Sequence, residues 1–446
     1  MLHTNHSKLY YMAMNKSKLV DFITLGCSKN LVDSEHLMRQ LQASGYEVHH
    51  DSEKPEGRIV IINTCGFIGD AQEESINTIL QFADLRKRHK IDKLFVMGCL
   101  SQRYLKEMAQ EIPEVDHFYG KFDYNGILAT LGGKFNAGFA VERTLTTLSH
   151  YAYVKISEGC NRTCSYCAIP IITGKHHSRA TEEIVNEVTW LVSQGVKEIQ
   201  LIAQDLSYYG YDTNHKAMLP DLVNRIADIQ GVEWLRLHYA YPAKFPIELL
   251  KVMRERENIC NYLDLALQHS SDTMLKRMRR NITLEQTRDL LQTIRKEVPG
   301  IHIRTTLLVG HPGETEEEFD ELKAFVSEQR FERLGVFAYS HEIGTFAYQH
   351  YLDDVSEPIK AKRVNEIMEL QRTISAEHNQ SKVGKTLKVM IDKEESEFYI
   401  GRTEFDSPEV DPEILIAKTN ILATGTFYSV KITNFDDYDL FGEVIL

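Results

Sequence analysis

The sequence predicts an α/β protein with two regions of parallel β-sheet and a small carboxyl-terminal β-barrel. Short apolar runs alternate with amphipathic stretches through two long parts of the chain, which is the alternation of strands and helices in a parallel sheet. From residue 385 onward the chain changes to short β-rich runs that are broken by Gly, Pro, Asp and Asn. Such spacing is typical of a small barrel. The length of 446 residues suits two or three domains.

The first region, residues 19–135, contains three predicted buried strands and at least two covering helices. The strands are expected at 19–25, 58–63 and 93–97, and the helices at 33–44 and 70–87. Residues 1–18 are polar and basic, and we expect a flexible extension there. The glycine-rich stretch near 132–138 predicts a linker over residues 136–148.

The second region, residues 149–376, repeats the strand–helix rhythm six times. The strands are expected at 151–156, 198–203, 234–239, 262–268, 302–309 and 334–339. Six such units predict a partial barrel that is open on one side, with ligands at the carboxyl ends of its strands. The third region, residues 377–446, holds the predicted β-barrel of antiparallel strands.

Composition limits the location and the partners of the chain. No apolar run approaches the roughly 20 residues that span a bilayer, so we expect a cytoplasmic protein with no membrane partner. The formal net charge is −13. Nucleic-acid binders usually carry a basic surface, so this charge makes tRNA an unlikely partner and permits a basic protein partner.

Three cysteines stand together just after the first strand of the second region, as Cys160-Asn-Arg-Thr-Cys164-Ser-Tyr-Cys167. Three thiolates on one tight loop can ligate three irons of a 4Fe–4S cluster and leave the fourth iron open to a small molecule. A structural zinc site is the alternative, but it needs four ligands. No fourth Cys or His lies at suitable local spacing. The spacing therefore favours a cluster.

Three more cysteines, Cys27, Cys65 and Cys99, each lie beside a glycine just past a predicted strand. Neighbouring strand ends of a parallel sheet share one edge, so the three sulfurs can converge on a second metal centre. The alternative is three buried free cysteines, a common state of this residue. The seventh cysteine, Cys260, has no partner nearby and is expected to pack in the core.

These residues resemble a known family, the radical S-adenosylmethionine methylthiotransferases. CNRTCSYC fits the CxxxCxxC motif of radical S-adenosylmethionine enzymes, and GCSKN, NTCGFI and MGC are similar to the amino-terminal domain of the methylthiotransferases. LIAQDLSYYG, QHSS and VGHPGET resemble further blocks of that family. The resemblance covers residues 19–446. It implies a Rossmann-like amino-terminal domain, a partial (βα)6 TIM-like radical barrel and a TRAM domain at the carboxyl end.

Two branches of the family matter, because one modifies isopentenylated adenosine in tRNA and the other an aspartate of ribosomal protein twelve of the small subunit. The block from Asp406 to Asp411, DSPEVD, resembles the DAPEVD of the ribosomal-protein branch. It departs from that block at Ser407, and at Pro412 where glycine is usual. From residue 381 onward, seven basic side chains stand against thirteen acidic ones, a net charge of −6. An acidic barrel suits a basic ribosomal protein better than tRNA phosphates. The tRNA enzyme stays as an alternative, and a non-catalytic iron–sulfur carrier as a remote one.

The resemblance also implies the cofactors and their ligands. It implies two 4Fe–4S clusters, held by the loop-cysteine set (Cys160, Cys164, Cys167) and by the amino-terminal cysteine set (Cys27, Cys65, Cys99). S-adenosylmethionine would chelate the open iron of the first cluster. One electron, supplied by an electron donor, would cleave it to a 5′-deoxyadenosyl radical, which would abstract a hydrogen atom from the aspartate β-carbon. The second cluster would carry the sulfur to be methylated. The residues implied to contact S-adenosylmethionine are Tyr166, Gln204, Asp205, Gly310, Pro312, Gly313 and Glu314.

Overall fold

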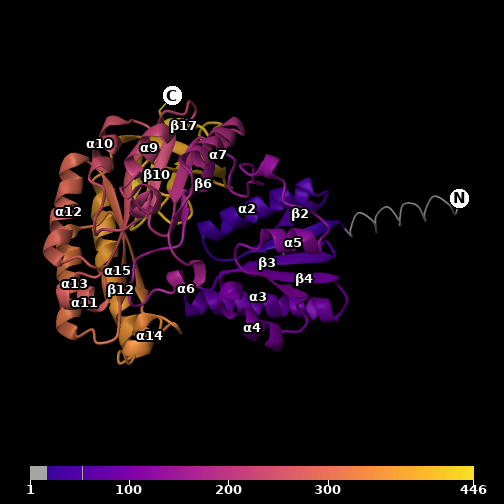
Figure 1. Ribbon diagram of the computed structural model, residues 1–446. Coiled ribbons are helices and arrows are strands. Elements are labelled where there is room, and N and C mark those ends of the chain that lie inside the picture. The colour runs from indigo at the N-terminus through magenta and orange to yellow at the C-terminus, as the bar shows by residue number, and fades with distance from the viewer. Residues whose placement is uncertain (1–17, 53, 446) are drawn as a thin grey trace, which may run out of the picture. The chain divides into compact units, whose positions relative to one another are not determined.

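The computed structural model describes residues 18–52 and 54–445. The chain divides into two compact units. Unit 1 comprises the chain up to residue 147 together with residues 168–175, and unit 2 comprises residues 148–167 and the chain from 176 onward (Figure 1). The extension predicted at 1–18 falls, except for its last residue, outside the described residues. No helix among the described residues is both long and apolar enough to cross a membrane.

Unit 1 is built on a five-stranded parallel sheet in the order β2-β1-β3-β4-β5. The strands are β1 (Leu19–Thr24), β2 (Glu47–His50), β3 (Ile59–Thr64), β4 (Lys93–Gly98) and β5 (His117–Phe118). The three predicted strands are confirmed. The two edge strands escaped the sequence analysis because β2 has four partly exposed residues and β5 only two, too few for an apolar run.

Helices cover both faces of this sheet, and each face has its own hydrophobic core. The helices of unit 1 are α2 (Ser28–Ala43), α3 (Gly69–Lys87), α4 (Cys99–Glu111), α5 (Tyr124–Thr130), the 3-10 turn η1 (Ala137–Phe139) and α6 (Ile169–Thr173). The stretch expected as a linker packs on α2. Gln40 donates to the Asn136 carbonyl oxygen over 3.1 Å, and Arg39 pairs with Glu142 at 2.7 Å.

Unit 2 contains a six-stranded parallel sheet in the order β13-β12-β11-β10-β9-β6, which confirms the six predicted strands. Its strands are β6 (Tyr151–Lys155), β9 (Glu198–Ile202), β10 (Trp234–Ala240), β11 (Ile259–Gln268), β12 (His302–Val309) and β13 (Arg333–Ala338). A two-stranded ribbon, β7 (Ser157–Glu158) with β8 (His177–Ser178), closes the base of the cysteine loop. Cys260 lies in β11 and packs with Trp234 and Tyr262 in a buried cluster.

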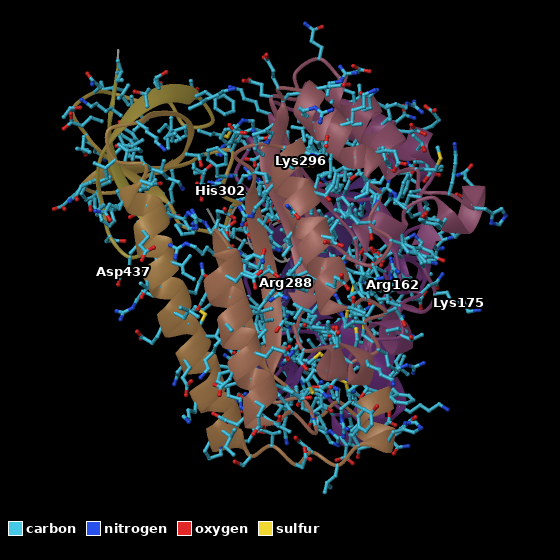
Figure 2. All side chains as sticks on the ribbon, turned by 90° about the vertical axis from the view of Figure 1, so that its left-hand side faces the viewer. Arg162, Lys175, Arg288, Lys296, His302 and Asp437 are labelled. Carbon is cyan, nitrogen blue, oxygen red and sulfur yellow. The ribbon has the colours of Figure 1, made fainter. Side chains whose placement is uncertain are left out.

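The helices of unit 2 follow the strands in sequence and form an outer layer (Figures 1 and 2). They are α7 (Thr181–Ser193), η2 (Leu206–Tyr208), α8 (Tyr211–Asn214), α9 (Leu219–Ala227), α10 (Glu248–Glu255), α11 (Asp272–Arg277), α12 (Leu284–Glu297), α13 (Glu316–Gln329), α14 (Phe346–His350) and α15 (Glu357–Gln380). Arg288 of α12, labelled in Figure 2, pairs with Glu328 of α13 at 2.6 Å. Ion pairs on the outer surface thus join neighbouring helices.

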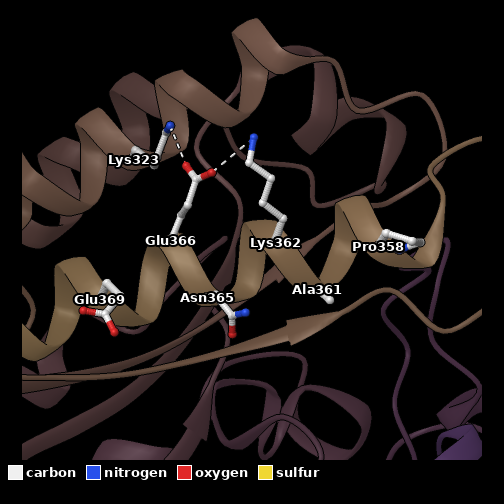
Figure 3. A pocket seen from close by; sticks show the side chains of 7 residues that line it. All are labelled: Lys323, Pro358, Ala361, Lys362, Asn365, Glu366 and Glu369. Atoms are coloured by element: carbon white, nitrogen blue, oxygen red, sulfur yellow. Dashed lines mark hydrogen bonds and ion pairs between the residues drawn. The ribbon is translucent and has the colours of Figure 1, made fainter.

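The longest helix, α15, connects the sheet of unit 2 to the carboxyl-terminal barrel. Its side chain Glu366 forms ion pairs with Lys323 of α13 at 2.9 Å and with Lys362 at 3.4 Å (Figure 3). Near its other end, the Asn379 amide donates to the Tyr438 carbonyl oxygen of the barrel over 2.7 Å. The helix therefore contacts both parts of unit 2.

The carboxyl-terminal strands form a closed five-stranded barrel in the order β14-β15-β16-β18-β17. They are β14 (Thr386–Glu394), β15 (Phe398–Arg402), β16 (Ile414–Ala417), β17 (Phe427–Phe435) and β18 (Leu440–Val444). The predicted barrel is confirmed, but its purely antiparallel character is wrong: β16 and β18 pair in parallel. The last strand, β18, lies between β17 and β16, and its pair with β16 is the one that runs in the same direction.

A buried ion network joins the barrel to the amino-terminal end of the sheet in unit 2. Glu198 of β9 is fully buried and pairs with Arg402 at 2.8 Å and with Arg236 at 3.1 Å. Asp392 of β14 pairs with Arg402, and its carboxylate also lies 2.7 Å from Nε2 of His150. Buried charges are stable only when they are paired, so these contacts hold the two parts together in one arrangement.

The DSPEVD block, residues 406–411, belongs to the same junction. Asp406 is buried and forms an ion pair with Arg333 of β13. Asp411 forms an ion pair with Arg304 of β12. The third acid, Glu409, accepts from the hydroxyls of Tyr151 and Tyr153. The acidic residues of this block therefore bind the chain's own side chains.

Candidate functional site

The amino-terminal cysteine set lies on three neighbouring turns at the carboxyl edge of the sheet in unit 1. Cys27 follows β1, Cys65 follows β3, and Cys99 follows β4, and these strands are adjacent. The glycines beside them allow close approach. A Cβ at Gly26, whose φ is +96°, would lie 2.7 Å from the Cys65 Cβ, and one at Gly66 would lie 2.6 Å from the Leu100 Cα. The structure thus brings the three predicted turns together.

Asn30, which the sequence analysis did not single out, ties these turns to one another. Its amide nitrogen donates to the carbonyl oxygens of Leu25 and Thr64, each over 3.0 Å. Its Oδ1 accepts from the Cys99 thiol, with a distance of 3.4 Å between Sγ and Oδ1. One side chain therefore contacts the turn after each of the three strands. Its place in GCSKN, three residues after Cys27, was the available signal.

The three thiols differ in their tendency to ionise. Desolvation raises the pKa of Cys27, but Lys29, the Asn30 backbone N–H and Lys121 more than offset it, so that this pKa lies below its ordinary value. Burial raises the pKa of Cys99 to about 12, and the neighbouring charges of Cys27 and Cys65 contribute to the increase. The thiols are thus close enough to affect one another's ionisation. Metal binding would deprotonate all three.

The loop-cysteine set lies between β7 and α6. The loop is tight: the Cys167 backbone N–H donates to the Cys164 carbonyl oxygen over 3.2 Å, and the Arg162 backbone N–H donates to the Cys160 sulfur over 3.4 Å. Burial raises the pKa of Cys160 to about 12. The three cysteines form no disulfide among the described residues, and they lie at the carboxyl end of the first barrel strand, as expected from the sequence.

Two arginines lie on either side of Tyr241 next to this loop. The guanidinium carbon of Arg162, a residue labelled in Figure 2, lies 4.1 Å from the Tyr241 ring centroid, and that of Arg280 lies at the same distance. Arg280 donates to the Cys164 sulfur over 3.3 Å and to the Tyr166 hydroxyl over 3.2 Å. The predicted cofactor residue Tyr166, which is part of the cysteine loop, is thus half-buried with its hydroxyl bound by Arg280.

Gln204 and Asp205 follow β9 at the same end of the sheet. The Asp205 carboxylate is buried and fully engaged, because it accepts from Arg162 over 2.7 Å and from Ser207 over 2.5 Å. Gln204 donates to Glu158 over 3.2 Å, whereas its Oε1 is buried with no hydrogen-bond partner among the described residues. A buried acceptor without a donor is costly unless a ligand satisfies it. Gln204 therefore fits a cofactor contact, and Asp205 holds Arg162.

The predicted turn from Gly310 to Glu314 follows β12. Both Gly310 and Gly313 have positive φ, and a Cβ at Gly310 would lie 2.3 Å from the Lys360 Cγ. The Glu314 carboxylate accepts from the backbone N–H groups of Gly310 and His311 and pairs with Arg363 of α15 at 3.1 Å. Burial raises the pKa of Glu314 to about 7. Glu314 thus fixes the shape of the turn, and the Pro312 carbonyl accepts from the His311 ring at 3.2 Å when its Nδ1 is protonated.

The donor sets fit iron–sulfur clusters better than single metal ions. Within the described ranges, no group of three or more His, Cys, Asp or Glu side chains is arranged to hold one metal ion. Ligands of one zinc must all lie about 2.3 Å from it, whereas the cysteines of a cluster bind different irons and can stand farther apart. The zinc alternative gains no support from these side chains. Two sets of three cysteines suit clusters with one open iron each.

Arg280 and Tyr241 were missed by the sequence analysis for a physical reason. Arg280 lies 116 residues from Cys164, and Tyr241 lies 77 residues from it. Only the ordering of the strands brings these segments together at one end of the sheet. No local spacing signals such a contact.

Three family models match successive parts of the chain. The radical SAM superfamily matches residues 154–326, the uncharacterized protein family UPF0004 matches residues 19–120, and the TRAM domain matches residues 383–445. The radical SAM match covers the cysteine loop and the sheet of unit 2, which assigns an iron–sulfur cluster and S-adenosylmethionine to this domain.

Among solved structures, the similarity is one of fold. The radical S-adenosylmethionine methyltransferase TsrM from Kitasatospora setae superposes with a TM-score of 0.53 at 15% identity, covering 72% of this chain and 75% of that one. The cobalamin-dependent radical enzyme OxsB, in its apo form, gives a TM-score of 0.53 at 12% identity, covering 82% of this chain and 58% of that one.

Relatives of nearly equal length are much closer in sequence. Ribosomal protein uS12 methylthiotransferase RimO of Phocaeicola vulgatus is 61% identical over 431 residues, which are 96% of this chain and 100% of the relative. The proteins of the same name from Porphyromonas gingivalis and Cytophaga hutchinsonii are 57% and 50% identical, over 96% and 97% of this chain and 99% of each relative. The chain therefore belongs to the RimO family of radical SAM methylthiotransferases.

Proposed function

We propose that this enzyme adds a methylthio group to the β-carbon of an aspartate in ribosomal protein uS12. The observation that carries the proposal is the pair of cysteine triads, one on the sheet edge of unit 1 and one on the loop of unit 2. Each triad suits a cluster with one open iron. Relatives of the same length carry the name of this activity.

In this proposal, each cysteine set holds one 4Fe–4S cluster. The loop cluster, when bound, supplies the electron for reductive cleavage of S-adenosylmethionine. The chain's own residues prepare that site: Gln204 offers its unpartnered Oε1 to the cofactor, and Asp205 orients Arg162 within the loop. Glu314 keeps the turn after β12 in shape. Tyr166 lines the buried side of the same site.

The amino-terminal cysteine set has the chemistry of a sulfur-carrying centre. The lowered pKa of Cys27, a consequence of Lys29, the Asn30 N–H and Lys121, favours its thiolate form for metal binding. Asn30 keeps the three turns at fixed separations. The proposed reaction also needs an external electron donor, because the two clusters are the only redox groups that the proposal assigns to the chain.

The carboxyl-terminal barrel is proposed to recruit the basic ribosomal protein. Asp392, Asp406, Asp411 and Arg402 form buried ion pairs, and Lys382 is buried as well. Apart from these five residues, ten acidic and five basic side chains remain from residue 381 onward. The barrel stays acidic after its internal pairs are set aside, which favours a basic protein over tRNA.

The experiment that tests the proposal is mass spectrometry of ribosomal proteins and tRNA from cells with and without the gene. We expect a methylthio mass gain on an aspartate of uS12 that disappears with the gene, and unchanged tRNA adenosines. A methylthio group found only on tRNA adenosine would place the enzyme in the other branch. A chain that modifies neither, although it binds iron, would match the carrier alternative.

A further inference from the structure

We propose that Arg280 is a positioning residue that raises the reduction potential of the cluster on the loop-cysteine set. The inference rests on the proposed cluster and concerns a side chain outside every motif of the sequence analysis. Arg280 follows α11, and its guanidinium reaches across to the cysteine loop. It is buried, with a relative exposure of 3%.

Four contacts fix this guanidinium. It donates to the Cys164 sulfur over 3.3 Å and to the Tyr166 hydroxyl over 3.2 Å. It also donates to the Ala266 carbonyl oxygen of β11 and stacks 4.1 Å from the Tyr241 ring centroid. Tyr241 in turn donates its hydroxyl to the Arg280 carbonyl oxygen over 2.6 Å. The side chain therefore has one defined position beside the sulfur.

Among the described residues, no carboxylate forms an ion pair with Arg280. The neighbouring groups with the largest electrostatic effect on Arg280 are Tyr166, Cys164 and Tyr241, and none of these is an Asp or Glu. Arg162, on the opposite side of the Tyr241 ring, differs in this respect because Asp205 pairs with it at 2.7 Å. Of the two arginines, Arg280 is thus the one whose positive charge remains available to the cysteine thiolates.

A buried cation beside a ligating sulfur changes the equilibrium for reduction of the cluster. Reduction adds one negative charge, and a nearby positive charge in a region of low dielectric constant stabilises the reduced form. Hydrogen bonds to the sulfurs and the net charge are known determinants of cluster potential. Both effects of Arg280 have the same sign, so its presence makes the cluster easier to reduce.

The test is a redox titration of the reconstituted full-length protein, followed by electron paramagnetic resonance. A variant with the amino-terminal cysteine set changed to Ala assigns the signal of the loop cluster. We expect Arg280→Gln to lower the equilibrium constant for reduction of that cluster at least tenfold, which is about 59 mV for a one-electron couple. Arg280→Lys keeps the charge and loses the forked geometry, so we expect its cluster potential to lie between those of Arg280→Gln and the wild type.

Arg279→Gln is the matched control. Arg279 is the preceding residue and carries the same charge, but its guanidinium lies 4.4 Å from the Phe346 ring centroid. We expect its potential to equal that of the wild type. If Arg280→Gln and Arg279→Gln have the same potential, the proposal is wrong.

A second measurement covers the case in which Arg280→Gln does not retain the cluster. Wild-type protein labelled with 15N only in the arginine guanidinium groups should show a hyperfine coupling to the reduced loop cluster, and Arg280→Lys should lose it. Absence of that coupling in the wild type would overturn the proposal. Iron analysis distinguishes failure of the Arg280 proposal from failure of the proposed function. Wild-type protein without iron on the loop-cysteine set would refute the proposed cluster itself.

Discussion

Changing Glu198 to Gln should loosen the carboxyl-terminal barrel from the sheet of unit 2. Glu198 is fully buried and is the one carboxylate that contacts both Arg236 and Arg402 among the described residues. The amide of Gln has nearly the same shape but no charge. Arg402 would keep Asp392 as its partner. Arg236 would lose its carboxylate and keep uncharged partners, the carbonyl oxygens of Glu404 and Thr403 and two aromatic rings.

The expected loss of stability is large. Removing one partner of a buried ion pair costs about 3–5 kcal/mol, because an uncompensated charge is left behind. Domains of ordinary size are stable by about 5–15 kcal/mol, so the change removes a substantial part of that margin. The matched control is Glu328→Gln, which breaks the exposed pair with Arg288 and should cost no more than about 1 kcal/mol.

Trp234 gives a local signal for the assay. Its ring lies 4.7 Å from the Phe427 ring of β17, at a contact between the sheet and the barrel. Urea unfolding followed by tryptophan fluorescence, in a Trp190→Phe background, therefore reports separation of these two parts. The Glu198→Gln transition should move to lower urea, well beyond the shift of the control. Equal midpoints for the two variants would show that the network adds nothing to stability.

Four further predictions follow from the same contacts. Changing the loop-cysteine set to Ala should reduce the iron content from about eight to about four per chain and abolish formation of 5′-deoxyadenosine; continued formation would refute the assignment of this set. Changing the amino-terminal cysteine set to Ala should stop methylthio transfer and leave some cleavage of S-adenosylmethionine, whereas complete loss of cleavage in a folded variant would contradict two separate sites. Changing Asp437, Glu397 and Glu443 to Lys should slow association with uS12 and reduce the dependence of its rate on salt. Salt screens such attraction because the Debye length shrinks from about 10 Å at 0.1 M salt to about 3 Å at 1 M. An unchanged rate would mean that the charge of the barrel does not recruit uS12. Burial raises the pKa of Glu198 and of Asp392, but their arginine and histidine partners bring both pKa values below the ordinary ones. The stability that these carboxylates contribute is therefore present above about pH 4.5 and is lost as the pH falls through their lower folded-state pKa values. Urea midpoints that stay constant down to about pH 3 would contradict this sign.

Much of the fold could be predicted because its strands are long apolar runs. The three central strands of unit 1 and the strands β6, β9 and β10 of unit 2 are buried almost throughout, and burial on both faces leaves a largely apolar stretch in the sequence. The edge strands β2 and β5 lack that signal. The parallel pairing of β16 with β18 was missed because it depends on barrel closure and not on any property of the two strands alone.

The site divides in the same way. The cysteines of the loop share one short motif, and the glycines beside Cys27 and Cys65 marked the turns of unit 1. Contacts between distant segments left no such mark. Arg280 reaches Cys164 only through the order of the strands. Two of the three DSPEVD acids are partners of Arg333 and Arg304, and the third accepts from two tyrosine hydroxyls. A motif can identify a branch of a family although its side chains face inward.

The helix α15 also limits how the gene can change. One end places Arg363 against Glu314 in the turn after β12, and the other places Asn379 against the Tyr438 carbonyl oxygen of the barrel. Each residue of an α-helix adds about 1.5 Å and about 100° of rotation. A single-residue insertion between Arg363 and Asn379 would turn one of them away from its partner. The helix should therefore tolerate substitutions on its outer face, such as at Asn365 and Glu369 (Figure 3), far better than any change in its length.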